Sequence, residues 1–161
     1  MIRTALLAAL TLAVAQPAMA LSCLRPTVQS SFQHADQSEA QYTLAVGRIR
    51  VLPGQTIPEQ PDDPNQRQGY ELQARFQGQL ASATGFDTPA DFPVTLKVEC
   101  VAAWCGGVPL DRVLAFVERT EDGNLITEGP CPRDLLQASP EALEQAMACI
   151  RGEACEVTDR P

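Results

Sequence analysis

The chain has 161 residues, a formal net charge of −8 and a sequence pI of about 4.6. This length suits one domain with a hydrophobic core, but not two. The acidic composition opposes binding to nucleic acid, which needs Lys and Arg against phosphates, and equally opposes binding to anionic lipid surfaces. A positively charged partner is compatible with the charge, but solubility alone also explains it.

The first 20 residues have the pattern of a secretory signal peptide. Arg3 gives a positive start, an uncharged apolar stretch follows, and Ala18, Met19 and Ala20 form a small-x-small cleavage site. The stretch is too short for a membrane span. We expect removal of residues 1–20, which leaves 141 residues and a net charge of −9 because Arg3 is the signal's one charged residue. The Ala-rich composition suggests a bacterial protein, periplasmic or secreted.

A lipid anchor is the alternative fate of this N-terminus. Residues 20–23 loosely resemble a lipoprotein box ending at Cys23, but Ala20 stands where a larger aliphatic residue is usual. A structural, lipid-anchored envelope component would be acylated at Cys23. No later stretch is long and apolar enough to span a bilayer.

Six cysteines follow the cleavage site, and an even number in an exported chain predicts a disulfide framework. They are Cys23, Cys100, Cys105, Cys131, Cys149 and Cys155. Fifteen connectivities are possible, and the sequence does not choose between them. A bridge from Cys23 to the central block would close the longest loop, and Cys149 with Cys155 could hold the end of a helix.

Zinc is the rival explanation of the cysteines. Structural zinc sites use closely spaced Cys pairs, or Cys with His, whereas here the spacings are Cys-x4-Cys and Cys-x5-Cys and the one histidine is His34. A cysteine nucleophile would need a free thiol and a nearby base. We therefore predict no metal, no cofactor and no catalytic residue.

The first half of the mature chain contains two predicted strands. Residues 21–41 are expected to be irregular, with one helical turn at most and Phe32 packed inward. Residues 42–51 alternate as a strand, and the apolar phase shifts by one residue at Gly47, which predicts a β-bulge. Residues 53–69 form a proline-rich loop. Residues 70–77 have the clearest alternation in the chain, and a second loop is expected over residues 81–91.

The second half predicts three strands, a helix and a tail. The strands cover about residues 93–101, 112–119 and 124–128, and a tight turn at Gly123 joins the last two. Ser139 caps a helix whose predicted apolar face is Leu143, Met147 and Ile150, and Gly152 ends it. Residues 42–155 thus form one domain, preceded by segment 21–41 and followed by tail 156–161.

These elements predict a mostly β fold: a small, disulfide-bonded, five-stranded OB-like β-barrel with a C-terminal α-helix. Over residues 23–137 the chain resembles the netrin-like family, which includes the tissue inhibitors of metalloproteinases. The resemblance is carried by motifs in a fixed order. They are Cys23, Phe32-x-x-Ala35-Asp36, Tyr70-x-Leu72, Phe76-x-Gly78, Cys105-Gly106 with Leu110, Leu114 to Val117, and Asp122-Gly123-x-Leu125 followed by Cys131.

The resemblance implies an OB-type barrel, with Cys105 and Cys131 bridged toward the N-terminal segment. It also implies protease inhibition, in which an N-terminal cysteine's amine and carbonyl chelate the protease zinc. The sequence departs from that pattern because Leu21 and Ser22 precede Cys23 and no second N-terminal cysteine follows.

Other polar residues have ordinary structural explanations. His34 is predicted to be a solvated surface residue, and Asp62-Asp63 and Asp87…Asp91 solvated loop charges. Arg48, Arg50, Arg75 and Lys97 could bind a carboxylate or sugar, but we interpret them as the outward half of alternating strands.

The sequence therefore predicts an exported, non-enzymatic binding module directed at an unknown protein, with a protease-inhibitor-like domain as its sharper form. The candidate partner-binding residues are Cys23, Leu24 and Trp104. In the inhibitor-like form, the N-terminal segment would act together with the adjacent loops 53–69 and 81–91. The alternatives are the lipid-anchored component and a cysteine-dependent enzyme.

Overall fold

The computed structural model describes residues 23, 26–153 and 155–156, so the predicted signal peptide, Leu24 and most of the tail lie outside the described residues. The strands are β1 (Gln41–Val51), β2 (Tyr70–Ala81), β3 (Phe86–Val98), β4 (Cys100–Val101), β5 (Trp104–Cys105), β6 (Val113–Thr120), β7 (Gly123–Glu128) and β8 (Leu135–Gln137). The helices are α2 (Val28–Gln37), the short 3-10 helix η1 (Pro64–Gln66) and α3 (Pro140–Ile150).

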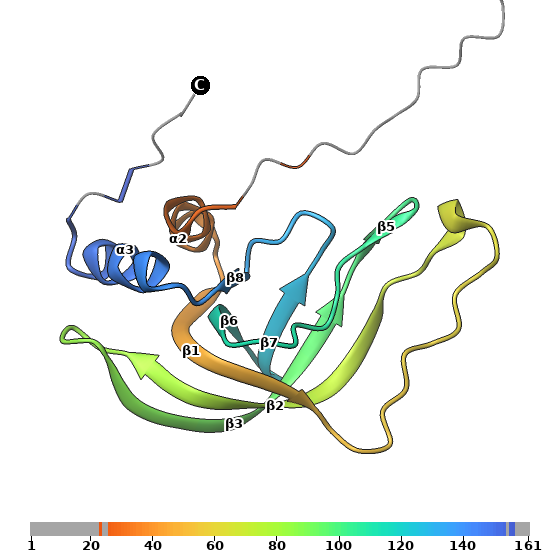
Figure 1. Ribbon diagram of the computed structural model, residues 1–161, viewed down its shortest axis with the longest axis horizontal. Helices are drawn as coiled ribbons and strands as arrows, with labels where there is room; N and C mark the ends of the chain where they lie inside the picture. Colours follow the sequence, from red (N-terminus) through yellow and green to blue (C-terminus); the bar gives the residue numbers. More distant parts are fainter. Residues whose placement is uncertain (1–22, 24–25, 154, 157–161) are drawn as a thin grey trace, which may run out of the picture.

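Five strands close into a barrel because β1 pairs with two neighbours. Its residues 45–51 pair with β2, and its residues 41–47 pair with β6, both antiparallel. The other connections are β2 with β3 and β6 with β7, antiparallel, and β3 with β7, parallel. β8 extends the sheet beside β6, and Figure 1 shows the strong curvature of β1 to β3. The predicted mostly β barrel with a C-terminal helix is confirmed.

The predicted β-bulge at Gly47 is wrong. The register between β1 and β2 is continuous from Ala45↔Leu80 to Val51↔Ala74. The apolar phase shifts because the outer face of the first half of β1 is covered by helices: Tyr42 and Leu44 pack with the helices, whereas Ala45 and Ile49 face the barrel interior. The first half of β1 therefore has apolar side chains on both faces. In the sequence this looks like a one-residue shift of the apolar alternation.

Two glycines allow the strands to approach closely. Gly47 on β1 lies opposite Gly78 on β2. A Cβ on Gly78 would overlap the Val46 carbonyl oxygen, and one on Gly47 would overlap the Gln77 carbonyl and the tip of the Phe76 ring. Phe76 is fully buried and stacks on Phe92 at 5.2 Å between ring centroids. The missing side chains thus leave room for this aromatic pair at the point where β1 bends.

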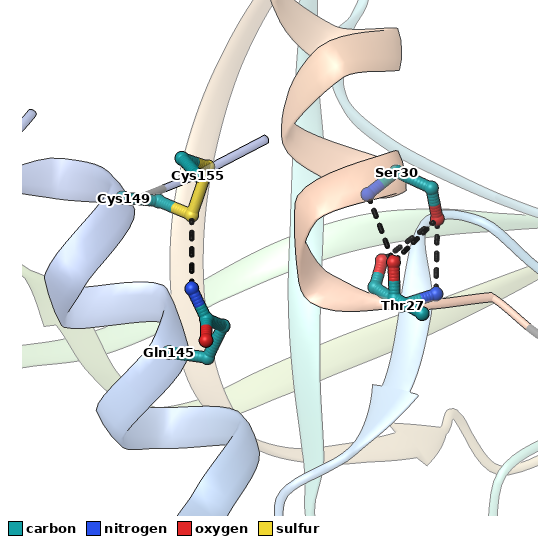
Figure 2. The surroundings of a disulfide bond; sticks show 5 residues. All are labelled: Thr27, Ser30, Gln145, Cys149 and Cys155. Carbon is teal, nitrogen blue, oxygen red and sulfur yellow. Dashed lines mark hydrogen bonds between the residues drawn. A yellow bond between two sulfur atoms is a disulfide. The ribbon is translucent and has the colours of Figure 1, made fainter. Parts of the chain in front are cut away.

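The N-terminal segment forms more structure than predicted. α2 has ten residues, not one turn, and begins with a capping box in which Thr27 and Ser30 exchange hydrogen bonds (Figure 2). Val28 and Phe32 lie on its inner side, where the Phe32 ring meets the Phe116 ring edge-on at 5.2 Å. Phe32 therefore packs inward as predicted, and the helix covers the outer face of the barrel.

The C-terminal helix α3 packs beside α2 (Figure 1). Ser139 caps it by accepting a hydrogen bond from the Ala142 amide, and Gly152 follows its end with φ of 72°, both as predicted. Its contact face differs from the prediction. Ala146 is fully buried at the centre of that face, with Ala142, Leu143 and Cys149 around it, whereas Met147 and Ile150 are half-buried outside this cluster.

The predicted loop at residues 81–91 is mostly strand. β2 runs to Ala81 and β3 starts at Phe86, so the two strands form a long hairpin. Among the described residues, the edge of β3 before Thr95 has no strand partner opposite β2. Pro93 directs its carbonyl to that edge, where it accepts a hydrogen bond from the Asn124 side chain, and Pro89 has the same orientation four residue pairs away. Both prolines therefore stand where no backbone N–H is required.

All six cysteines are paired, which confirms the predicted disulfide framework. The bridges are Cys23–Cys131, Cys100–Cys105 and Cys149–Cys155. Cys131 does bridge to the N-terminal segment, as the family resemblance implied. The same implication is wrong for Cys105, because this cysteine lies directly across a two-stranded ribbon from Cys100, at 4.0 Å between Cα atoms.

The glycine pair gives a test of barrel closure. We expect Gly78→Ala to lower the free energy of unfolding by about 1–3 kcal/mol, because the added methyl group overlaps backbone atoms of β1. Gly107→Ala is the matched control, since its Cβ would meet nothing within 4 Å, and its effect should stay within about 0.5 kcal/mol. Urea unfolding followed by circular dichroism measures both. Equal effects of the two substitutions would contradict the close approach.

The bridges should contribute unequally to stability. Cys23–Cys131 spans 108 residues and Cys149–Cys155 only 6. Since the entropy removed from the unfolded chain grows with loop length, we expect the double variant Cys23→Ser/Cys131→Ser to lose about 4–5 kcal/mol and Cys149→Ser/Cys155→Ser about 2 kcal/mol. Urea unfolding under oxidising conditions would reveal the order, and the reverse order would show that loop entropy does not dominate.

Candidate functional site

The β4–β5 hairpin projects from the barrel on the side away from α2 and α3 (Figure 1). Cys100 pairs with Cys105 and Val101 with Trp104, so Ala102 and Ala103 form the turn. Ala102 has φ of 50°, the one positive φ among non-glycine residues in the described part of the chain. The disulfide across the base of the hairpin ties its two strands into one unit.

Two large apolar side chains are exposed on this hairpin. Val101 is 54% exposed and Trp104 is 57% exposed. As a cross-strand pair, they lie on the same face of the ribbon. Leu110, in the segment that follows, is 89% exposed. The structure thus places Trp104, a candidate partner-binding residue, at the surface and adds Val101 beside it, which the sequence analysis did not single out.

A shallow groove of about 520 Å³ lies on one side of the hairpin. It is lined by the start of β2, the end of β3 and β4: Gly69, Tyr70, Glu71, Lys97, Val98, Glu99, Cys100 and Val101. Lys97 and Glu99 form an ion pair at 2.7 Å within it, and this pairing raises the pKa of Lys97. The groove therefore offers both charge signs beside an apolar wall.

The predicted loop 53–69 borders the same end of the barrel. Its Arg67 guanidinium donates a hydrogen bond to the Ala103 carbonyl at the hairpin turn, at 3.2 Å. Ile57 in this loop is 58% exposed. The loop and the hairpin together form what we call the hairpin end, defined as residues 52–69 and 99–112.

A second cavity, of about 250 Å³, lies on the other side of the hairpin. Its lining includes Val101, Cys131 and Asp134. Through Cys131 it adjoins the bridge to Cys23, which is itself exposed. Two of the three predicted partner-binding residues therefore lie next to residues that line this cavity. Cys23 is bonded to Cys131, and Trp104 is the cross-strand partner of Val101. Leu24, the third, lies outside the described residues.

Two buried carboxyl groups lie next to this cavity, and the sequence analysis missed both. Burial and the nearby Asp134 carboxylate raise the pKa of Glu128 to about 8. Its Oε2 atom is buried without a hydrogen-bond partner in the described structure. Burial also raises the pKa of Asp134, although a hydrogen bond from the Thr127 amide and the charges of His34 and Arg133 oppose this.

A sequence signal for Glu128 did exist. Ile126 is fully buried in β7, and alternation places Glu128, two residues later, on the same inward face. The register confirms this position, because Glu128 lies beside Val98, which is fully buried. For Asp134 the signal was weaker, since it stands in an irregular segment before β8.

The remaining polar candidates have structural roles. His34 is half-buried rather than solvated, with its ring against Tyr42 at 6.3 Å between centroids. Asp63 caps η1, and hydrogen bonds to Asn65 and Gln66 lower its pKa. Asp87 accepts from Ser82 and Thr84 in the β2–β3 turn, which lowers its pKa.

The basic residues of the early strands face outward, as predicted. Arg48 and Arg50 are exposed on β1, and Arg50 lies opposite Arg75 on β2. Two like charges in register repel each other. The Arg75 guanidinium also pairs with Asp91 on β3, which lowers the pKa of that carboxyl.

Within the described residues, no three His, Cys, Asp or Glu side chains are grouped so that they could hold a metal ion. No helix in the described part of the chain has the length and apolar character needed to cross a membrane. Three disulfides are typical of proteins outside the cytoplasm. Compared with known family models, curated proteins and solved structures, the chain matches none.

The raised pKa of Glu128 predicts a stability that falls with pH. The unfolded carboxyl has the ordinary value of 4.5 and the folded one about 8, so between these values the folded state binds more protons. Rising pH therefore favours unfolding over this window. Because the group is partly exposed, we expect a loss of only about 2 kcal/mol between pH 4.5 and 8.

Comparing urea unfolding at pH 5 and pH 8 checks this expectation. The glutamine side chain of Glu128→Gln cannot ionise, so this variant should lack the pH-dependent loss of stability that comes from Glu128. Glu153→Gln is the control: Glu153 is exposed and its partner Arg151 lowers its pKa, so it stays ionised across the window. A wild-type pH dependence retained in Glu128→Gln would contradict the assignment.

Proposed function

We propose that this chain is an exported module that binds another protein through its hairpin end. The observation that carries the proposal is the exposed pair Val101 and Trp104 on a hairpin closed by Cys100–Cys105. Binding hot spots are enriched in Trp, and an anchor that is already rigid loses little conformational entropy on binding. The adjoining groove and cavity supply recesses for a partner's side chains.

The finer form of the proposal is a netrin-like, inhibitor-like domain of the periplasm or extracellular space. The closed five-stranded barrel and the bridge from Cys23 to Cys131 support it, since the family resemblance implies both. The pairing of Cys105 with Cys100 departs from it. Under this proposal the segment at Cys23 and the β4–β5 hairpin contact the same partner from two sides of the second cavity.

The disulfides argue against both alternative functions, the lipid-anchored component and the cysteine-dependent enzyme. Thioether acylation needs the sulfur of Cys23, which is bonded to Cys131, and so the lipid-anchored form is disfavoured. A cysteine nucleophile needs a thiolate, whereas all six sulfurs are paired. We accordingly propose a binding protein rather than an enzyme.

Photo-crosslinking tests the binding surface in the exported protein. A photoreactive amino acid at position 104 should capture a partner, whereas the same amino acid at Gln79, exposed on β2, should not. The captured partner then allows an affinity measurement. We expect Trp104→Ala to weaken binding at least tenfold, since truncation of a central Trp costs about 2 kcal/mol or more, and Trp104→Phe to weaken it less.

Two results would contradict the proposal: equal capture from positions 104 and 79, or an affinity unchanged in Trp104→Ala. Because Trp104 is exposed, its replacement should change stability by less than about 0.5 kcal/mol, and a urea unfolding curve of the variant separates lost binding from lost folding.

A further inference from the structure

Glu128 is located where the β4–β5 hairpin joins the barrel. Its carbonyl accepts a hydrogen bond from the Glu99 amide, just before β4, at 2.9 Å. The Gly106 amide, just after β5, donates to the Glu99 carbonyl at 3.0 Å. Gly106 lies so close that a Cβ there would overlap the Glu128 carbonyl and approach its Cγ to 3.1 Å. Both ends of the hairpin therefore rest on this one residue.

One oxygen of the half-buried Glu128 carboxyl lacks compensation for a negative charge. Its Oε2 is buried without a hydrogen-bond partner among the described residues. The charged group that acts on it is Asp134, which is also acidic and only 6% exposed. A buried carboxylate in this setting would be both desolvated and repelled.

The surrounding elements contribute further charged and titratable groups. They are Lys97 and Glu99 from β3 and the segment after it, Glu118 from β6, Tyr42 from β1, His34 from α2 and Arg133 beside Asp134. Lys97 is engaged with Glu99. His34 and Arg133 act mainly on Asp134. No cation in this set is recorded as a partner of Glu128.

We propose that the β4–β5 hairpin is a proton-controlled flap, closed on the barrel while Glu128 is protonated and released as Glu128 loses its proton. The 250 Å³ cavity is lined by Glu99 and Val101 at the hairpin and by Thr127 and Gly129 on either side of Glu128, so opening gives water a path toward the carboxylate. The Cys100–Cys105 bridge makes the hairpin move as a unit. The flap concerns the isolated domain and holds whether or not Trp104 binds a partner.

The hairpin has the properties of a unit that can open separately. Val101 and Trp104 are more than half exposed, so opening uncovers little apolar surface from them, and the apolar contact that opening must break is that of Cys105 with the barrel core. Gly107 follows the hairpin, and a side chain there would meet nothing within 4 Å. The five barrel strands, by contrast, are joined into a closed sheet because β1 pairs with both β2 and β6. Opening of the hairpin can thus occur while the barrel stays folded.

The direction of the effect follows from the two protonation equilibria. In the open state the solvated carboxyl has an ordinary pKa near 4.5, and in the closed state its pKa is about 8. Between these values each pH unit should raise the ratio of open to closed hairpins by up to about tenfold, and above pH 8 the ratio should level off. The hairpin is therefore most firmly closed in acid.

Hydrogen exchange at the Glu99 and Gly106 amides measures the opening directly. After correction for the intrinsic exchange rate, we expect their protection to fall by about 30-fold in all between pH 5 and 8, which is less than the limit of tenfold per unit because the group is partly exposed. The Phe76 amide, in the barrel ladder, should keep its protection. Glu128→Gln should make the protection of the two hairpin amides independent of pH, whereas Glu153→Gln should behave as wild type.

A second measurement holds even if Glu128→Gln does not fold. The side-chain carboxyl carbon of Glu128, followed by NMR in the wild-type protein, should titrate well above 4.5, and Asp134→Asn should shift its midpoint to lower pH. The flap is overturned if Glu128 titrates as an ordinary carboxyl, if protection at Glu99 and Gly106 does not change with pH, or if Glu128→Gln keeps the wild-type slope.

Discussion

The close approach of β1 and β2 at Gly47 and Gly78 is the constraint on which the rest of the barrel depends. β1 pairs with both β2 and β6, and at Gly47 and Gly78 the strands β1 and β2 approach too closely for either to carry a side chain. The Phe76 ring occupies the space so provided. Closure then leaves one outer face of the sheet apolar, and α2 and α3 cover it.

The three disulfides divide the molecule into a scaffold and an appendage. Cys23–Cys131 ties the start of the described chain to the loop after β7, and Cys149–Cys155 holds the end of α3. Cys100–Cys105 instead closes a ribbon on itself. Glu128 lies at the joint between the two parts. A rigid barrel can therefore carry a small exposed apolar ribbon whose position responds to protonation.

The sequence predicted strands correctly where one face of the strand is exposed to solvent and the other is buried. β2 was predicted from its alternation because its inner residues are buried and its outer ones exposed. The first half of β1 misled the analysis, since helices cover its outer face. α2 was underestimated because Thr27 and Ser30, which cap it, also suit irregular segments. Helix coverage is a tertiary property that periodicity in one strand cannot report.

The candidate site was only half visible in the sequence. Trp104 was selected as a candidate because it is the one tryptophan of the chain, but its 57% exposure depends on the β4–β5 hairpin and was not predicted. The charge state of Glu128 could not be predicted, since it depends on Gly106 and Asp134 being folded against it. The alternation from Ile126 predicts that the Glu128 side chain points inward. It does not predict that its Oε2 atom lacks a hydrogen-bond partner among the described residues.

The prolines of β3 have a consequence for behaviour in a crowded compartment. An unpaired strand edge is a template on which a second chain can add its own strand and begin a fibre. Pro89 and Pro93 break the donor pattern along that edge. Edge-to-edge pairing of two copies through this part of β3 would therefore leave backbone carbonyls without donors, which makes such pairing less favourable at any concentration.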